Sequence, residues 1–165
     1  MKVKLASNSD LKSILNVIEL AKQIMLANGN TTQWINGYPS EEIILKDIEE
    51  NHGFVIVNNG EIEGYFCFLK GNNPEPTYQS IKEGKWLNNE SYGVIHRLAS
   101  SGRVKGIADA CFDFCFSEIN NIKVDTHENN IPMQKYFKKI GFNYCGIIYV
   151  GDGSPRRAFQ MVVLD

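Results

Sequence analysis

The sequence predicts a single α/β domain, residues 1–165, built on a mixed and mostly antiparallel sheet of six to seven strands flanked by about four helices. Three observations lead to this fold class. Strand-like and helix-like hydrophobic patterns follow one another in the order β, α, α, β, β, β, α, β, α, β, β. No internal repeat, low-complexity segment or linker separates them. A chain of 165 residues is also long enough to bury one sizeable hydrophobic core.

The N-terminal part contributes one strand and two helices. After a short apolar strand at residues 3–5, apolar side chains recur every three to four positions over residues 11–25, as on one face of an amphipathic helix. The stretch SNSD before this helix supplies side chains that cap helices. A second helix begins at Ser40 and continues to about Asn51, with Gly53 as its stop signal.

A hairpin and a long connection follow. Runs of β-branched and aromatic residues at 54–57 and 62–69 flank the sequence NNGE, whose Asn-Gly pair strongly favours a tight hairpin turn. Residues 70–90 are instead rich in Asn, Pro, Gly and Lys. Long irregular connections are uncommon in compact domains unless they cover or line a site, so we expect this one to face the substrate.

The C-terminal part alternates strands and helices. Its elements are, in order, a strand at residues 92–99, a helix that starts near Val104, a strand at 122–126, a helix at 133–140 that ends at Gly141, and a hairpin formed by 144–150 and 158–163. Pro132 suits the first turn of the last helix, where a missing N–H costs nothing.

The composition argues against several classes of function. With 17 basic and 19 acidic residues, the formal net charge of -2 offers no general attraction to nucleic acids or anionic lipids. There is no apolar stretch typical of a signal peptide or a membrane span, so we expect a cytoplasmic protein that binds neither nucleic acid nor membrane. The 4 cysteines lack the spacing of a metal site and are expected to be buried free thiols.

The most informative stretch is SSGRVKGIA, residues 100–108, where a strand passes into a helix. The first N–H groups of such a helix lack internal partners and carry the positive end of the helix dipole, so they bind anions and especially phosphates. Gly106 permits close approach of a phosphate, while Arg103 and Lys105 add positive charge. Neither GxxxxGK nor GxGxxG occurs in the chain. The residues alone therefore leave two alternatives, another kind of phosphate site or a plain strand-to-helix turn.

Two motifs in this region resemble one known family. RVKGIA resembles the (Gln/Arg)-x-x-Gly-x-(Gly/Ala) signature of the GCN5-related N-acetyltransferases (GNAT), and NIPMQKYFKKIGF resembles that family's next block. The resemblance implies a GNAT-like fold over nearly the whole chain and acetyl-CoA as the acetyl donor. Loop amides would hold the pyrophosphate, and a splayed strand would pair with the pantetheine arm as though with another strand. The residues that the resemblance places at the cofactor are Leu98, Ala99, Ser100, Arg103, Val104, Lys105, Gly106, Ile107, Ala108, Asn130 and Phe137.

The chain departs from the family pattern at several of these positions. Where many members carry a tyrosine that protonates the departing thiolate, this chain has Phe137, which has no proton to give. Tyr136 is one residue early, which turns its side chain by about 100° around a helix, so the tyrosine's role is assigned to neither residue. Val104 and Met133 replace small residues, which is tolerable where the backbone makes the contact. Asn130 is equally well explained as a helix N-cap.

Acetyl transfer to an amine requires a group that removes a proton and a donor that stabilises the oxyanion. A backbone N–H of the splayed strand can supply the donor. His96 is the first candidate base, although a structural histidine would look the same in the sequence. Strict alternation along the strand places His96 on the same face as Leu98 and Ser100, with Arg97 on the other.

Three further residues are candidates at the acceptor end. His127 closes the strand IKVDTH and is the second candidate catalytic residue, for acceptor binding or proton relay. Trp34 and Tyr38 lie in the polar loop between the first two helices and are candidate acceptor-binding residues. Large aromatic side chains in a loop are also common covers of a hydrophobic core, so this alternative stays open.

The residues and the resemblance together leave three hypotheses for the function. The first is an acetyl-CoA-dependent N-acetyltransferase that acts on a primary amine of a small molecule, peptide or protein. It would act by direct attack in a ternary complex, because no Cys or Ser has a recognisable activating neighbour. The second is a non-catalytic acyl-CoA-binding or sensing module on the same fold. The third is an α/β domain whose loop binds another phosphate or nothing. The sequence does not identify the amine acceptor, and the edge of the C-terminal hairpin could support a homodimer.

Overall fold

The computed structural model describes residues 1–164 and contains every helix and strand expected from the sequence. The helices are α1 (Leu11–Ala27), α2 (Glu41–Glu49), α3 (Ile107–Glu118) and α4 (Ile131–Ile140). The strands are β1 (Lys2–Leu5), β2 (Gly53–Asn58), β3 (Glu61–Gly71), β4 (Tyr92–Ser100), β5 (Asn121–Thr126), β6 (Asn143–Tyr149) and β7 (Pro155–Val162). Two short 3-10 turns are also present. The first, η1 (Asn8–Asp10), precedes α1, and the second, η2 (Pro76–Gln79), lies in the connection between β3 and β4.

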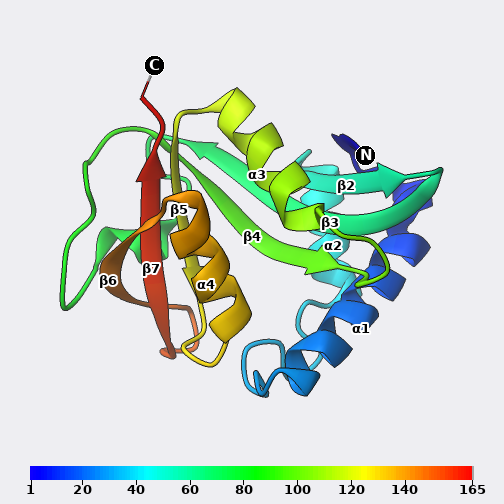
Figure 1. Ribbon diagram of the computed structural model, residues 1–165, viewed down its shortest axis with the longest axis horizontal. Coiled ribbons are helices and arrows are strands. Elements are labelled where there is room, and N and C mark those ends of the chain that lie inside the picture. The colour runs from blue at the N-terminus through cyan, green and yellow to red at the C-terminus, as the bar shows by residue number, and fades with distance from the viewer. Residues whose placement is uncertain (165) are drawn as a thin grey trace.

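Within residues 1–164 the seven strands form one sheet in the order β1-β2-β3-β4-β5-β7-β6. Among these described strands, β4 and β5 are the only parallel neighbours, so the prediction of a mixed and mostly antiparallel sheet is confirmed. The parallel pairing holds only where Gly93 faces Ile122 and Val94 faces Lys123. Beyond these positions the two strands diverge, as their ribbons show in Figure 1.

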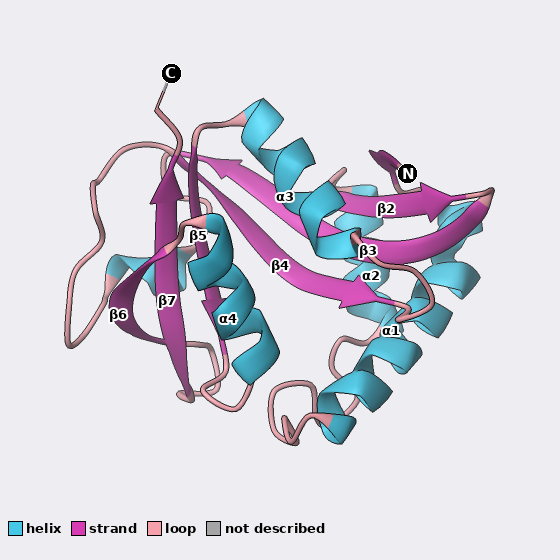
Figure 2. Cartoon of the chain, in the orientation of Figure 1, coloured by secondary structure: helices cyan, strands magenta, loops and turns pink. Residues whose placement is uncertain are grey.

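The helices cover both faces of the sheet. Figures 1 and 2 show α3 and α4 in front of the sheet and α2 behind it. Tyr65 of β3 belongs to the buried cluster that contains Ile14 of α1, whereas its neighbour Phe66 belongs to the cluster that contains Phe112 of α3. Successive side chains of a strand point to opposite faces, so β3 contributes to both layers of the core.

Local signals in the sequence explain most element boundaries. The tight turn between β2 and β3 uses Asn59 and Gly60 at φ values of 52° and 80°, as an Asn-Gly hairpin requires. The Ser40 side chain caps α2. The expected stop signal at Gly53 is wrong, because Gly53 begins β2 and Asn51, at a φ of 61°, takes the left-handed conformation after the helix.

A β-bulge interrupts β4 at the edge of the divergence. Cys67 of β3 lies opposite His96, and Tyr65 lies opposite Ala99, so the one β3 residue between them, Phe66, faces two residues of β4. Residues directly opposite each other share a face, which places His96 and Ala99 on the same side. Arg97 takes a φ of 55° and supplies the extra residue.

The bulge corrects the alternation predicted for β4. Arg97 binds Asp47 of α2 and therefore lies on the same face as His96, not on the opposite face. Leu98 instead packs on the cluster under α3. The prediction that His96 shares a face with Leu98 is wrong, because simple alternation does not allow for an inserted residue.

The long connection between β3 and β4 is packed against the domain. Tyr78 of η2 is buried, and its carbonyl oxygen accepts a hydrogen bond from Nε1 of Trp86 at 2.7 Å. Lys82 forms a β-bridge with Ile147, so the connection also covers part of the edge of β6. No helix among residues 1–164 combines the length and apolar character needed to span a membrane.

Candidate functional site

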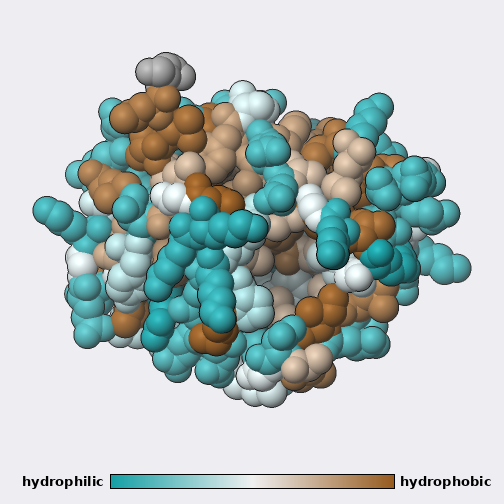
Figure 3. Space-filling model, viewed as in Figure 1, coloured by the Kyte–Doolittle hydropathy of each residue, from teal (hydrophilic) through white to brown (hydrophobic). Residues whose placement is uncertain are grey.

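A cleft of about 770 Å³ opens where β4 and β5 separate. Side chains from both faces of the sheet line it, including Phe112 and Met133 from the α3 and α4 side and Asp47 and Arg97 from the α2 side. The loop between α1 and α2, the long connection and the hairpin between β6 and β7 complete its walls. Figure 3 shows the surface hollowed near its centre, between α4 and β4.

The loop after β4 presents a row of free backbone amides. In the described part of the chain, none of the N–H groups of residues 104–109 donates a hydrogen bond to a protein acceptor. Gly106, the N-cap of α3, takes a left-handed φ of 91°. The helix begins at Ile107, later than the Val104 expected from the sequence, so the free amides span a loop as well as the first turn. Such a row of N–H groups at a helix N-terminus suits a phosphate.

The side chains of this loop are held by a buried carboxylate. Glu63 of β3 accepts hydrogen bonds from Oγ of Ser101 at 2.5 Å and from Nε of Arg103 at 3.1 Å. Burial alone would raise the pKa of the Glu63 carboxyl, but these two hydrogen bonds and the Arg103 charge hold it below its ordinary value. The Arg103 charge, which the sequence assigned to anion binding, is thus largely compensated by Glu63.

The predicted cofactor strand has a free backbone edge beyond Val94, because β5 no longer pairs with it. Leu98 lines the cleft from this strand. Ala99 is buried against α1, so only its backbone faces outward. Ser100 uses its Oγ to accept the N–H of Gly102 at 3.2 Å, which shapes the start of the loop.

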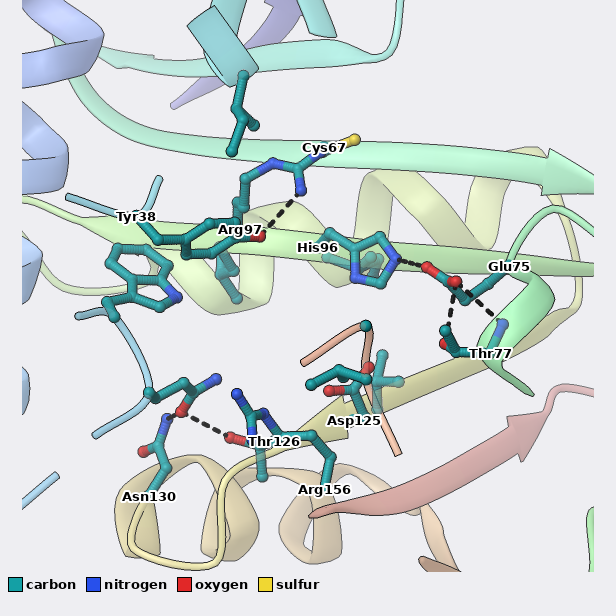
Figure 4. A pocket seen from close by; sticks show the side chains of 18 of the residues that line it. Tyr38, Cys67, Glu75, Thr77, His96, Arg97, Asp125, Thr126, Asn130 and Arg156 are labelled. Atoms are coloured by element: carbon teal, nitrogen blue, oxygen red, sulfur yellow. Dashed lines mark hydrogen bonds and ion pairs between the residues drawn. The ribbon is translucent and has the colours of Figure 1, made fainter. Parts of the chain in front are cut away.

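His96 and Glu75 form a pair inside the cleft, as Figure 4 shows. Nε2 of His96 lies 2.7 Å from Oε1 of Glu75. Burial by itself would raise the pKa of Glu75, but hydrogen bonds from His96 and Thr77 lower it below its ordinary value. The ionised carboxylate can only accept, so Nε2 of His96 carries the proton and donates it.

Arg97 connects three elements around the cleft. Its Nε and Nη2 donate to the two carboxylate oxygens of Asp47 at 2.9 and 2.7 Å, and its Nη1 donates to Oη of Tyr38 at 3.1 Å. Tyr65 also donates to Asp47, at 2.6 Å, and burial together with this bond raises the pKa of the tyrosine. The bidentate ion pair fixes the bulge of β4 against α2.

The candidate acceptor residues differ in position. Trp34 and Tyr38 both line the cleft. His127 is not among the residues that line it. Its Nδ1 accepts the N–H of Asn129 at 3.0 Å and its Nε2 lies 2.8 Å from Oγ1 of Thr32, so the ring links the start of α4 to the loop between α1 and α2. Burial and the nearby Arg156 charge lower the pKa of His127.

Residues of the second motif, NIPMQKYFKKIGF, mainly cap α4 and pack it against the core. Asn130 caps α4 by accepting the N–H of Met133 at 3.3 Å, and it also lines the cleft. Phe137 lines the cleft too, but it is only 3% exposed and packs in the aromatic core. Oη of Tyr136 points to α3, where it donates to Asp109 at 2.7 Å.

Several cleft residues have no signal of their own in the sequence. Glu75 is 21 positions from His96, and Asp47 is 50 positions from Arg97. The composition of residues 70–90 indicated that the connection lines a site, and Glu75 and Thr77 do line the cleft, but no pattern distinguished them. Gln33, beside the predicted Trp34, also lines the cleft and was missed.

Comparison with known proteins bears on the same region. A model of the acetyltransferase (GNAT) family matches residues 23–142, which include the cleft strands, the loop after β4 and α4. Among curated proteins no significant sequence match is found.

Solved structures share the fold. A GNAT-family acetyltransferase from Streptococcus agalactiae 2603 is 31% identical, with coverage of 99% of this chain and 96% of that chain and a TM-score of 0.89. The ribosomal-protein-S18-alanine N-acetyltransferase of Escherichia coli is 12% identical, with 99% and 94% coverage and a TM-score of 0.64. A mutant agmatine N-acetyltransferase is 10% identical, with 98% and 99% coverage and a TM-score of 0.64. At the two lower identities the likeness shows the fold alone.

Proposed function

The chain belongs to the GNAT family of acetyltransferases, and on this premise we propose that it is an N-acetyltransferase. It transfers the acetyl group of acetyl-CoA to a primary amine of a small molecule, peptide or protein, by direct attack in a ternary complex. The observation that carries this proposal is the row of free amides at residues 104–109, next to the free edge of β4.

The residues of the loop and strand fit acetyl-CoA. The amides of residues 104–109 would hold the pyrophosphate, with the N-terminal dipole of α3 favouring its charge. Gly106 presents no Cβ to the ligand at a left-handed position. The free backbone edge at Leu98 and Ser100 would pair with the pantetheine arm as an added strand. When bound, acetyl-CoA supplies the reactive thioester.

His96 is the residue that we assign as general base. Because its Nε2 donates to Glu75, the neutral ring has its lone pair on Nδ1. Nδ1 has no hydrogen-bond partner among residues 1–164, and His96 lines the cleft. A base at this position removes a proton from the acceptor amine, which must be neutral to attack. Glu75 holds the tautomer and the ring orientation.

The acceptor would enter beside the loop between α1 and α2. Trp34 and Tyr38 offer aromatic surface there, and the bond from Arg97 fixes the Tyr38 hydroxyl. A backbone N–H on the free edge of β4 would stabilise the negative charge that develops on the thioester oxygen.

One observation supports a second candidate function, a non-catalytic acyl-CoA-binding module. Phe137, at the position where the family often has a proton-donating tyrosine, is buried in the aromatic core and has no proton to give. Such a module would bind the cofactor as tightly as an enzyme and would leave the thioester intact.

A panel of amines separates the two functions. The protein is incubated with acetyl-CoA and with diamines, amino acids or peptides that have a free N-terminus, and the released thiol is followed with a thiol reagent. We expect thiol release that requires a particular amine, together with the acetylated product by mass spectrometry. Tight CoA binding without amine-dependent release for any member of the panel would favour the non-catalytic module.

A further inference from the structure

The side-chain amide of Gln33 is held by three donors. Its Oε1 accepts hydrogen bonds from Nδ2 of Asn30 at 2.9 Å, from Nδ2 of Asn130 at 3.3 Å and from Oγ1 of Thr126 at 3.5 Å. These donors belong to the loop after α1, the N-cap of α4 and the last residue of β5. Figure 4 shows Thr126 and Asn130 on the same side of the cleft, with dashed bonds converging between them.

The orientation of this amide follows from a backbone group. Oδ1 of Asn130 accepts the N–H of Met133, and a backbone N–H can only donate. Nδ2 of Asn130 must therefore face Gln33, and the atom of Gln33 that meets it must be the acceptor Oε1. A reversed Gln33 amide would place two NH2 groups against each other.

Asn30 supports the same orientation of the Gln33 amide, although one of its own polar atoms is left without a partner within the described chain. It is only 3% exposed, and its Nδ2 points to Gln33. Its own Oδ1 is buried without a hydrogen-bond partner among residues 1–164. Buried polar atoms rarely lack a partner, and reversing the Asn30 amide would instead place its Oδ1 against Oε1 of Gln33.

The fixed Oε1 leaves the amide nitrogen on the other side. Nε2 of Gln33 donates to no acceptor in the described part of the chain, and Gln33 lines the cleft between Thr32 and Trp34. The two N–H groups of Nε2 are therefore oriented donors with no protein partner.

We propose that Gln33 is a ligand-binding residue whose Nε2 donates a hydrogen bond to a carbonyl or hydroxyl oxygen of a molecule bound in the cleft. A neutral amide donor fits a neutral oxygen. Two molecules of the proposed reaction can supply such an oxygen, namely the pantetheine arm of CoA and the amine acceptor. The inference rests on the proposed function for the identity of these ligands. A site that presents a fixed donor discriminates against ligands that lack the matching oxygen.

The alternative is a purely structural role, in which Gln33 only ties the loop to β5 and α4. The substitution Gln33→Glu separates the two roles. A glutamate keeps an oxygen that accepts from Asn30, Asn130 and Thr126, but it replaces the NH2 group with a second oxygen. Gln23→Glu on the exposed face of α1 introduces the same charge change outside the cleft and is the matched control.

The test combines CoA titration calorimetry, acceptor kinetics and NMR of the 15N-labelled protein. The side-chain NH2 signals of Gln33 are identified by their loss in Gln33→Glu. If the oxygen belongs to CoA, they shift on adding CoA, and Gln33→Glu raises the CoA dissociation constant about 10-fold or more. If it belongs to the acceptor, CoA affinity is unchanged and the KM of the amine found in the panel rises about 10-fold or more. Both results support the proposal, with Gln23→Glu unchanged.

Two other outcomes distinguish a failure of this inference from a failure of the proposed function. Equal CoA affinity and equal acceptor KM in the wild type and Gln33→Glu, with no shift of the Gln33 signals, would overturn this inference and leave the proposed function intact. Failure of the wild type itself to bind CoA would overturn the proposed function and this inference with it. Thermal unfolding of each variant shows whether the loop is still anchored.

Discussion

At the scale of single residues, two charged side chains of the cleft are held by specific polar partners. Glu75 contacts His96, and Asp47 binds Arg97 through two hydrogen bonds. A different arrangement surrounds Lys123, a buried lysine of β5 that has aromatic neighbours and no carboxylate within ion-pair distance in the described chain. The chemistry of His96 and the stability cost of Lys123 both follow from these surroundings.

Replacing His96 tests its role as base. We expect His96→Gln to lower kcat/KM for acetyl transfer about 100-fold or more, because it removes the proposed proton acceptor Nδ1, while CoA affinity stays within about two-fold. Glu75→Gln should reduce the rate less, since a neutral amide oxygen can still accept from Nε2. His127→Gln should have a smaller effect, because both ring nitrogens of His127 have protein partners. Steady-state kinetics and calorimetry measure these values, and a larger loss in His127→Gln than in His96→Gln would reverse the assignment.

The burial of Lys123 predicts that the free energy of unfolding depends on pH. It is 4% exposed, its Nζ lies 4.5 and 4.1 Å from the ring centres of Trp86 and Tyr92, and burial lowers its pKa to about 8 from 10.5. Burial disfavours the protonated lysine in the folded state, and this lowers the free energy of unfolding. The loss is complete below pH 8, where the folded protein keeps Lys123 protonated, and it disappears as the pH rises to 10.5.

Lys123→Met should therefore raise the free energy of unfolding by about 1–2 kcal/mol at pH 7. The gap from the wild type should close between pH 8 and 10.5, as measured by urea unfolding at several pH values. Lys135→Met, at an exposed position of α4, is the control and should change little. A difference that stays constant with pH would show that the charge of Lys123 is not the cause.

At the scale of elements, periodic patterns and turn residues were sufficient to predict the helices and strands. The Asn59-Gly60 turn and the Ser40 cap depend on local chemistry and appear where expected. The bulge at Arg97 could not be predicted, because it depends on pairing with β3 and on the ion pair with Asp47. The loop after β4 could be predicted in part. Its glycine is visible in the sequence, whereas the compensation of Arg103 by Glu63 is visible only in the structure.

Gly106 is the residue on which this loop depends. Alanine at its φ of 91° is expected to cost about 1–2 kcal/mol and to disturb the amide row, so Gly106→Ala should weaken CoA binding about 10-fold or more. Gly60→Ala is the matched control, since Gly60 has a φ of 80° in the turn between β2 and β3, outside the cleft, and nothing within 4 Å of an added Cβ. The control should lose similar stability but keep its CoA affinity. Equal CoA affinity in both variants, measured by calorimetry, would show that the amide row does not bind the cofactor.

At the scale of the whole molecule, the cleft exists because the sheet is divided. Among residues 1–164 the two halves of the sheet, β1 to β4 and β5 to β7, are joined through two parallel residue pairs, and the pairs His96–Glu75 and Arg97–Asp47 line the cleft that opens beyond them. Strand order and the point of divergence are long-range properties, which periodicity within a segment does not contain. The resemblance of the RVKGIA stretch to a known signature predicted the divergence, and Leu98 and Ser100 do lie beyond the last β4–β5 pair.

The most direct test of the central claim is thermal unfolding of the wild type with acetyl-CoA, CoA or ATP. A ligand at a hundred times its dissociation constant adds about 2.7 kcal/mol of stability, or roughly 5 to 10 °C for a chain of this size. We predict such a shift with acetyl-CoA and with CoA, and none with ATP at the same concentration. No shift with either CoA compound, or an equal shift with ATP, would contradict the assignment of residues 104–109 and the free edge of β4 to the acetyl donor.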